Sequence, residues 1–300
     1  MNFILIVLPV FIILAVGFIG QRVLDLDIKS ISTAALYLML PFLAFQTFYE
    51  NELNMNYLYI VLFCILLLFA LIMVSFLAGK MTSQQQSKTS AFVLAGAFMN
   101  SGNYGVPVIL FAFGETGFQY AVIMMVIQSL LMNTVGLYFA AKGSKSGGTL
   151  KDSVVKILKM PVVYGSIAGL SLQIASVPVP TFIYNAIDLI GSATIPTIML
   201  VLGMQLANIS KKNVEMKELS AVLVIRLVLS PVIAYAITAL LSLDSLLSSV
   251  LIVLAAMPTA ANTTMFAVQF DTEPDLVSFS TLVTTSISII TVPLMIMFFS

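Results

Sequence analysis

The stretch MNSGNYGVPV, from Met99 to Val108, places two asparagines, two glycines and a proline inside a long apolar segment. Glycine weakens a helix because it loses much backbone freedom on folding, and proline lacks the amide donor that continues the hydrogen-bond ladder. We therefore expect the helix that contains this stretch to be interrupted. In a lipid bilayer unpaired backbone groups are costly, so the break must lie against protein or a watery cavity.

The composition predicts that the surroundings of this break are a membrane. Of 300 residues, 60% are hydrophobic and 9% are charged, whereas a soluble domain has about 25% charged residues. Apolar runs close to the roughly 20 residues that cross a bilayer recur along the whole chain. We predict an all-α membrane protein with ten transmembrane helices. Their expected ranges are 2–21, 29–49, 56–79, 88–113, 117–141, 159–176, 181–207, 217–241, 245–270 and 275–299.

Several function classes are disfavoured by the residue counts. The 13 basic and 13 acidic side chains balance, so no nucleic-acid footprint is expected. Histidine is absent and Cys64 is the single cysteine, which excludes a disulfide or a cysteine-based metal cluster and leaves no cofactor expected. Because no catalytic triad or pair of catalytic carboxylates is recognisable, we do not expect an enzyme.

The basic residues predict the orientation. All but one of the basic residues follow the first, third, fifth or seventh expected helix. Odd-numbered helices all end on the same side of the membrane, so these basic residues share that side. They are Arg22, Lys29, Lys80, Lys88, Lys142, Lys145, Lys151, Lys156, Lys159, Lys211, Lys212 and Lys217. By the positive-inside rule this side is cytoplasmic. We therefore expect a multi-pass plasma-membrane protein with both termini outside and a cytoplasmic loop at 142–158.

The chain shows signs of an internal duplication. Leu8–Gln21 aligns with Met160–Gln173, and Pro41 lies in a context similar to that of Pro196. The matches keep their order at an offset of about 150 to 160 residues. We expect a first five-helix repeat at 1–141 and a second at 159–300, which enters the membrane inverted because five is an odd number.

A counterpart of the first break is present in the second half. AAMPTAANTTMF, from Ala255 to Phe266, again places proline, asparagine and threonine in the middle of a span. Paired interruptions in two inverted halves point to the binding site of a transporter. Each new half-helix has about half a positive charge at its amino end, which favours an anion. The alternative is that both breaks are packing kinks with interhelical hydrogen bonds.

Polar residues in and near the breaks are the candidate substrate-binding residues. They are Asn100, Ser101, Asn103, Tyr104, Pro107, Gln128, Asn133, Pro258, Thr259, Asn262 and Thr263. For Gln128 and Asn133, an interhelical hydrogen bond is an equal alternative to a substrate contact.

Two ionisable residues within apolar runs are candidates for coupling or electrostatic roles. Arg226 lies nine residues after Lys217, so we expect it to reach the cytoplasmic interface. The alternatives for Arg226 are substrate attraction and a core ion pair. Asp188 is expected near the outer interface or as a helix cap, with proton coupling as the alternative.

GNYGVP in the fourth expected helix, with a second proline and asparagine break in the ninth, resembles the auxin efflux carrier family, the bacterial branch related to plant PIN proteins. The resemblance implies two inverted five-helix repeats with helices 4 and 9 broken and crossed, as in bile-acid symporters and sodium/proton antiporters. It implies a scaffold of helices 1, 2, 6 and 7, a moving domain of helices 3–5 and 8–10, and a homodimer through the scaffold. By the same resemblance, Asn103, Pro107, Pro258 and Asn262 line a site for organic anions such as carboxylates.

We therefore expect a secondary transporter that moves a small organic anion by elevator-type alternating access. One alternative is a sodium-coupled symporter of the bile-acid type, which needs oxygen ligands and carboxylates near the crossing. Another is a membrane sensor without transport activity. A channel is disfavoured because two crossed half-helices form an occluded site more readily than an open pore.

Overall fold

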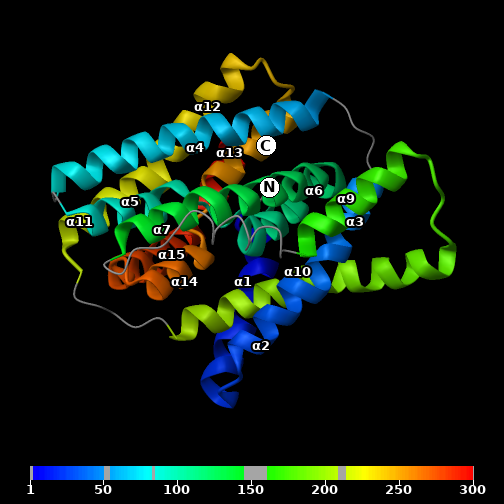
Figure 1. Cartoon of the computed structure of the whole chain (residues 1–300), viewed down its shortest axis with the longest axis horizontal. Coiled ribbons are helices and arrows are strands. Elements are labelled where there is room, and N and C mark those ends of the chain that lie inside the picture. The colour runs from blue at the N-terminus through cyan, green and yellow to red at the C-terminus, as the bar shows by residue number, and fades with distance from the viewer. Residues whose placement is uncertain (1–2, 51–54, 83–84, 145–160, 209–213, 300) are drawn as a thin grey trace.

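The computed structural model describes residues 3–50, 55–82, 85–144, 161–208 and 214–299, which form helices joined by short turns (Figure 1). In chain order the elements are α1 (Phe3–Leu24), α2 (Ile28–Thr33), η1 (Ala34–Met39), α3 (Leu40–Glu50), α4 (Met55–Thr82), α5 (Gln86–Ala97), η2 (Ser101–Gly105), α6 (Val106–Leu131), η3 (Met132–Gly136), α7 (Leu137–Gly143), α9 (Pro161–Ile174), α10 (Thr181–Asn208), α11 (Met216–Val224), η4 (Ile225–Leu229), α12 (Ser230–Leu240), α13 (Ser245–Ala255), α14 (Ala261–Phe270) and α15 (Pro274–Phe299). The four η elements are single π-helical turns within longer helices.

The helical ranges agree with the expected ranges to within a few residues, and both expected interruptions are present, after Ala97 and after Ala255. The expected turn after residue 113 is present as well, because α6 consists of two helices that meet at Gly114, whose φ of +66° and ψ of −164° are not helical. Only glycine adopts this φ without strain. From residue 145 onward, the expected loop 142–158 lies outside the described residues.

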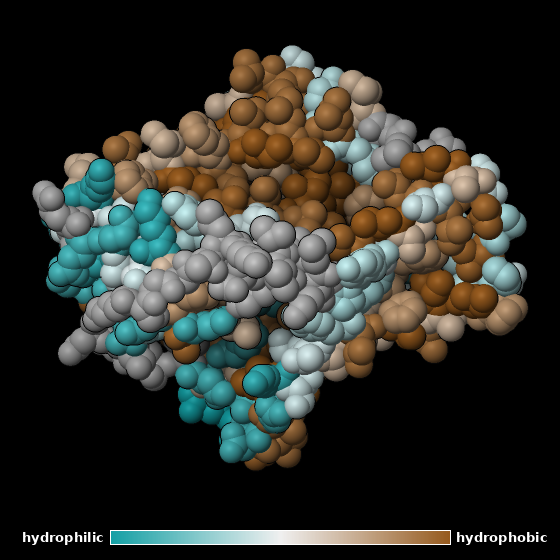
Figure 2. Space-filling model, viewed as in Figure 1, coloured by the Kyte–Doolittle hydropathy of each residue, from teal (hydrophilic) through white to brown (hydrophobic). Residues whose placement is uncertain are grey.

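The helices are apolar enough for a membrane. Six helical ranges of the described chain have the length and hydropathy to cross a bilayer. They are Ile28–Glu50, Met55–Thr82, Ser101–Gly143, Thr181–Asn208, Met216–Leu240 and Pro274–Phe299. Figure 2 shows hydrophobic residues over the upper and middle part of one face and hydrophilic residues at its left and bottom. The helical fold and these six ranges confirm the expectation of an all-α membrane protein.

Helices α1, α3, α9 and α10 pack on one another through two close crossings, α1 on α10 and α3 on α9. In Figure 1 they occupy the lower and right part of the molecule, and α4, α5, α7 and α11 to α15 lie to the left and top. A Cβ atom at Gly17 would overlap the carbonyl oxygen of Leu200, and a Cβ atom at Gly169 would overlap that of Phe45. Glycine is needed at both crossings because main chain meets main chain, as is common between membrane helices.

These two crossings occupy equivalent places in the two halves of the chain. Gly17 and Gly169 are matched in the internal alignment, and Phe45 and Leu200 each lie four residues after a matched proline. The same type of glycine-to-carbonyl contact is therefore made twice, once with each half supplying the glycine.

An ion pair ties α5 to α11 at the ends where both helices begin. The Lys88 ammonium donates to Glu218 at 2.5 Å and lies 3.8 Å from Glu215. The Glu218 side chain is 7% exposed, and Lys88 is the cation that lies against it.

Lys88→Met is expected to lower the free energy of unfolding by about 1–3 kcal/mol, because it leaves the buried Glu218 carboxylate without its cation. This expected loss of stability is smaller than for a fully buried ion pair, because Lys88 itself is partly exposed. Thermal unfolding in detergent measures the effect. Lys80→Met removes the same charge from an exposed position and serves as the control. Equal stability of the two variants would contradict the assignment.

Candidate functional site

The two helix interruptions lie against each other and are joined by backbone hydrogen bonds. Residues Phe98–Asn100, between α5 and η2, run antiparallel to the segment between α13 and α14. The Asn100 amide donates to the Pro258 carbonyl at 2.8 Å, and the Ala260 amide donates to the Phe98 carbonyl at 3.0 Å. The breaks thus pair part of the backbone that they free, as a membrane interior requires.

Threonine side chains brace this crossing. The hydroxyl of Thr259, which is fully buried, donates to the Ala95 carbonyl in the last turn of α5 at 2.7 Å. Its backbone amide donates to the Thr284 hydroxyl of α15 at 3.2 Å. The Thr263 hydroxyl donates to the Ala260 carbonyl at 2.7 Å. Both threonines were candidate substrate ligands, but in the structure their side chains satisfy backbone groups.

A cavity of about 40 Å³ lies beside the crossing. Its polar side chains are those of Asn100, Ser101, Asn103, Gln128, Ser129 and Asn262. Apolar side chains complete the wall, among them Leu36, Leu40 and Ile198 from the group that contains α3 and α10. Among the described residues no charged side chain lines this cavity.

Hydrogen-bond donors without partners gather at this cavity. The π-helical turn that leads into α6 begins at Ser101, α14 begins at Ala261, and neither helix has a side-chain cap. The amides of a first helical turn have no intrahelical acceptor, and the helix dipole adds about half a positive charge there. The Nδ2 of Asn100, a residue that is 5% exposed, also has no partner in the described structure. Such a set of donors suits an anionic oxygen ligand.

The remaining candidates lie elsewhere. Tyr104 is fully buried, accepts a hydrogen bond from Ser288 at 3.0 Å and packs edge-on against Phe11. Pro107 is also buried and does not line the cavity. The side-chain Nδ2 of Asn133 donates to the Ser129 carbonyl at 2.8 Å, within its own helix. The structure therefore brings together five of the eleven candidates as side chains on one cavity.

Sequence reasoning missed Ser129, Met125 and Met132, which also line the cavity. The candidates Gln128 and Asn133 pointed to the helix that carries these residues, but not to the side of that helix that lines the cavity.

A larger cavity of about 600 Å³ adjoins the small one, with which it shares Asn262, Ser129, Leu36 and Leu40. It lies between the α3 and α10 group and the helices α6, α14 and α15, and Lys29 lies on its wall. Asp27, whose carboxylate accepts from the Lys29 amide at 3.1 Å, caps the start of α2. A hydrogen bond from the Ser30 hydroxyl lowers the pKa of Asp27, so this cap stays ionised.

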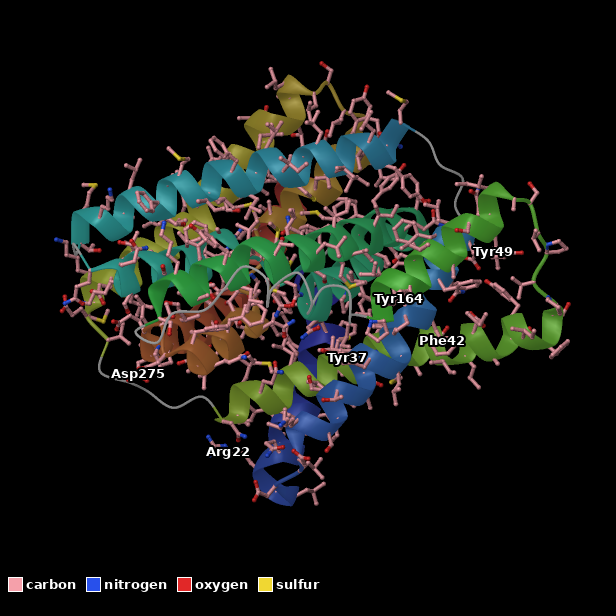
Figure 3. All side chains as sticks on the ribbon, in the orientation of Figure 1. Arg22, Tyr37, Phe42, Tyr49, Tyr164 and Asp275 are labelled. Carbon is pink, nitrogen blue, oxygen red and sulfur yellow. The ribbon has the colours of Figure 1, made fainter. Side chains whose placement is uncertain are left out.

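A separate cavity of about 400 Å³ lies on the other side of the crossing and carries three carboxylates, those of Glu50, Glu115 and Asp188. The exposed Asp188 carboxylate accepts a hydrogen bond from the side-chain Nε2 of Gln46 at 3.0 Å. Figure 3 places Tyr49, which precedes Glu50, toward the right of the molecule, and Arg22 and Asp275 toward the left.

The expectation for Arg226 was wrong. The side chain does not reach an interface but is fully buried, and it forms no ion pair among the described residues. Its guanidinium donates to the main-chain carbonyls of Gly96, at 2.9 Å, and Ala255, at 2.5 Å. The spacing from Lys217 gave its depth along the helix but not its lateral neighbours, and the neighbours provide the hydrogen bonds that keep it buried.

Comparison with known proteins gives a consistent match over the whole chain. A protein-family model described as "Membrane transport protein" matches twice, at residues 3–149 and 148–296. An uncharacterized transporter of Methanocaldococcus jannaschii is 26% identical, with 96% of each chain covered. A protein of Rhizobium meliloti named "Putative malonate transporter" is 26% identical, covering 95% of this chain and 92% of the relative.

Proposed function

Because the chain belongs to the membrane transport protein family, the auxin efflux carrier family that its GNYGVP motif resembles, we propose that it is a secondary transporter of small organic anions. The observation that carries the proposal is the crossing of two interrupted helices beside a cavity lined by unpaired donors. A carboxylate supplies the acceptors that these donors lack. The name of the Rhizobium meliloti relative supports malonate, or a similar dicarboxylate, as the first substrate to test.

The proposed architecture is ten membrane helices in two inverted five-helix repeats. The two successive family matches support a duplication. The crossing supports an approximate two-fold relation between the halves, because its two hydrogen bonds exchange when the halves exchange: Asn100 to Pro258 becomes Ala260 to Phe98. The paired glycine contacts at Gly17 and Gly169 support the same relation.

The proposed mechanism is elevator-type alternating access. The scaffold consists of α1, α2, η1, α3, α9 and α10, and the other helices form the moving domain. The 600 Å³ and 400 Å³ cavities both lie between these two groups, one on each side of the crossing. In the described conformation the crossing opens toward the cavity with Lys29. An anion enters there, binds the free amides and Asn262, and leaves on the other side after the moving domain has shifted.

The proposal includes a plasma-membrane location with both termini outside and the 142–158 loop in the cytoplasm, following the distribution of lysines. It also includes a homodimer formed through the scaffold. Transport then draws its energy from gradients of substrate or ions or from the membrane potential, which contributes about 2.3 kcal/mol per charge per 100 mV.

Uptake of labelled malonate into proteoliposomes that contain the purified protein tests the function. We expect saturable uptake that unlabelled dicarboxylates compete with and that does not require sodium. Proteoliposomes without protein are the control. Absence of saturable flux for every mono- and dicarboxylate tested would contradict the proposal, and strict dependence on sodium would favour the bile-acid type of symporter.

A further inference from the structure

Among the Asp, Glu, Lys and Arg side chains of the described structure, the one that is completely buried at the crossing is Arg226, in the η4 turn. It lines none of the three cavities described above. Its guanidinium spans two elements, because Nη1 donates to the Gly96 carbonyl at 2.9 Å and Nη2 donates to the Ala255 carbonyl at 2.5 Å. Nη2 also donates to the Ser230 hydroxyl, one helical turn away.

These two carbonyls lie at the carboxyl ends of the half-helices that precede the breaks. Gly96 is in the last turn of α5, which ends at Ala97, and α13 ends at Ala255 itself. The last carbonyls of a helix have no intrahelical donor, and each helix has about half a negative charge at this end. The Ser230 hydroxyl completes the arrangement by donating to the Ala255 carbonyl at 2.7 Å.

Both carbonyl ends lie next to the amide ends that face the small cavity, separated from them only by the crossing segments. Without a counter-charge, about one negative charge from the two carbonyl ends would offset about one positive charge from the two amide ends. A single guanidinium has the opposite charge to the two carbonyl ends together, and its planar fork can hold two acceptors in fixed positions.

We propose that Arg226 is a positioning residue that neutralises the carbonyl ends of α5 and α13, so that the amide ends of α6 and α14 give the substrate site its preference for anions. The inference rests on the proposed function, since it explains how a cavity lined by no cation in the described structure attracts a negative substrate. Arg226 acts from behind the crossing and does not touch the substrate.

The main chain that Arg226 binds at Gly96 is tightly packed against its neighbours. A Cβ atom at Gly96 would lie 2.6 Å from the Ser75 hydroxyl oxygen and 3.1 Å from an Ile225 methyl group. The main chain of α5 therefore approaches α4 and η4 closely at the residue whose carbonyl Arg226 holds. An uncharged side chain at position 226 would leave both carbonyl ends without a counter-charge.

The test compares the binding of malonate, a dianion, with that of malonamate, its singly charged monoamide, at a pH where every carboxyl group is ionised. In Arg226→Gln we expect the preference for malonate to fall about tenfold, the effect of one unit charge at roughly 10 Å in a medium of effective dielectric constant about 20. A purely structural role would weaken the binding of both compounds alike and leave their ratio unchanged. Isothermal titration of the purified protein measures both dissociation constants.

Ser230→Asp provides a second variant, because it keeps the guanidinium in place and sets a carboxylate beside it to cancel its charge. We expect the same loss of preference, whereas Arg226→Lys and the neutral Ser230→Ala should keep the preference of the unsubstituted protein. An unchanged ratio in a folded Arg226→Gln or in Ser230→Asp would overturn the inference.

Failure of the proposed function would be distinguishable. If the unsubstituted protein binds neither compound and transports no carboxylate, the transport proposal fails, and the role of Arg226 is then judged from hydrogen exchange at the backbone amides of Asn100 and Ala260. Arg226→Gln should accelerate this exchange about tenfold, since the crossing would open more easily. Unchanged exchange in that case would overturn the inference as well.

Discussion

Malonate uptake is expected to fall at least about a hundredfold when Asn100 and Asn262 are both replaced by alanine. A hydrogen bond to a charged group contributes about 1.5–3 kcal/mol, and two such bonds together exceed the roughly 2.8 kcal/mol that corresponds to a hundredfold change. Both side chains line the cavity at the crossing, and the side-chain Nδ2 of Asn100 has no other partner in the described structure. Initial rates in proteoliposomes measure the effect.

Asn185→Ala is the matched control, because Asn185 is exposed on α10 and lines none of the described cavities. It should transport like the unsubstituted protein. If the double variant transports malonate with an unaltered rate and KM, the anion does not bind at the crossing.

Gly17→Leu is expected to prevent assembly of the helix group around α1 and α10. Its side chain would overlap the Leu200 carbonyl oxygen, and because this neighbour is main chain, no rotamer change can relieve the contact. Overpacking usually costs about 1–3 kcal/mol, and separation of two helices along a crossing should cost more than about 3 kcal/mol. The yield of monodisperse protein in size-exclusion chromatography and its Tm measure the loss.

Gly20→Leu on the same helix is the control, since a Cβ atom there would have nothing within 4 Å. This variant should fold normally. A Gly17→Leu protein as stable as Gly20→Leu would show that α1 and α10 do not cross as described.

The positions of the two helix interruptions could be predicted from the sequence, but the role of the glycines could not. Gly105 is helical, with φ of −67° and ψ of −50°, and a Cβ atom there would lie 2.7 Å from the Leu254 side chain, so its small size serves close packing and not a turn of the backbone. The break at Gly114 has a local cause that the sequence does reveal, because only glycine adopts its φ of +66° without strain.

The direction in which each polar side chain points could not be predicted. Tyr104 and Asn103 are adjacent in sequence, yet Asn103 lines the cavity and Tyr104 packs between α1 and α15. Arg226 is the clearest case, because its partners are main-chain carbonyls on two other helices that come together only in the folded chain. Hydropathy gives the depth of such a residue but not its partners.

The position of a bound dicarboxylate labelled with bromine, such as bromosuccinate, tests the central claim most directly. Anomalous scattering from crystals of the complex would locate the bromine. We predict a single site beside Asn100, Ser101 and Asn262, with the Met99 and Thr259 segments paired behind it. A ligand bound only among Glu50, Glu115 and Asp188, or an unbroken helix at either crossing segment, would contradict the account.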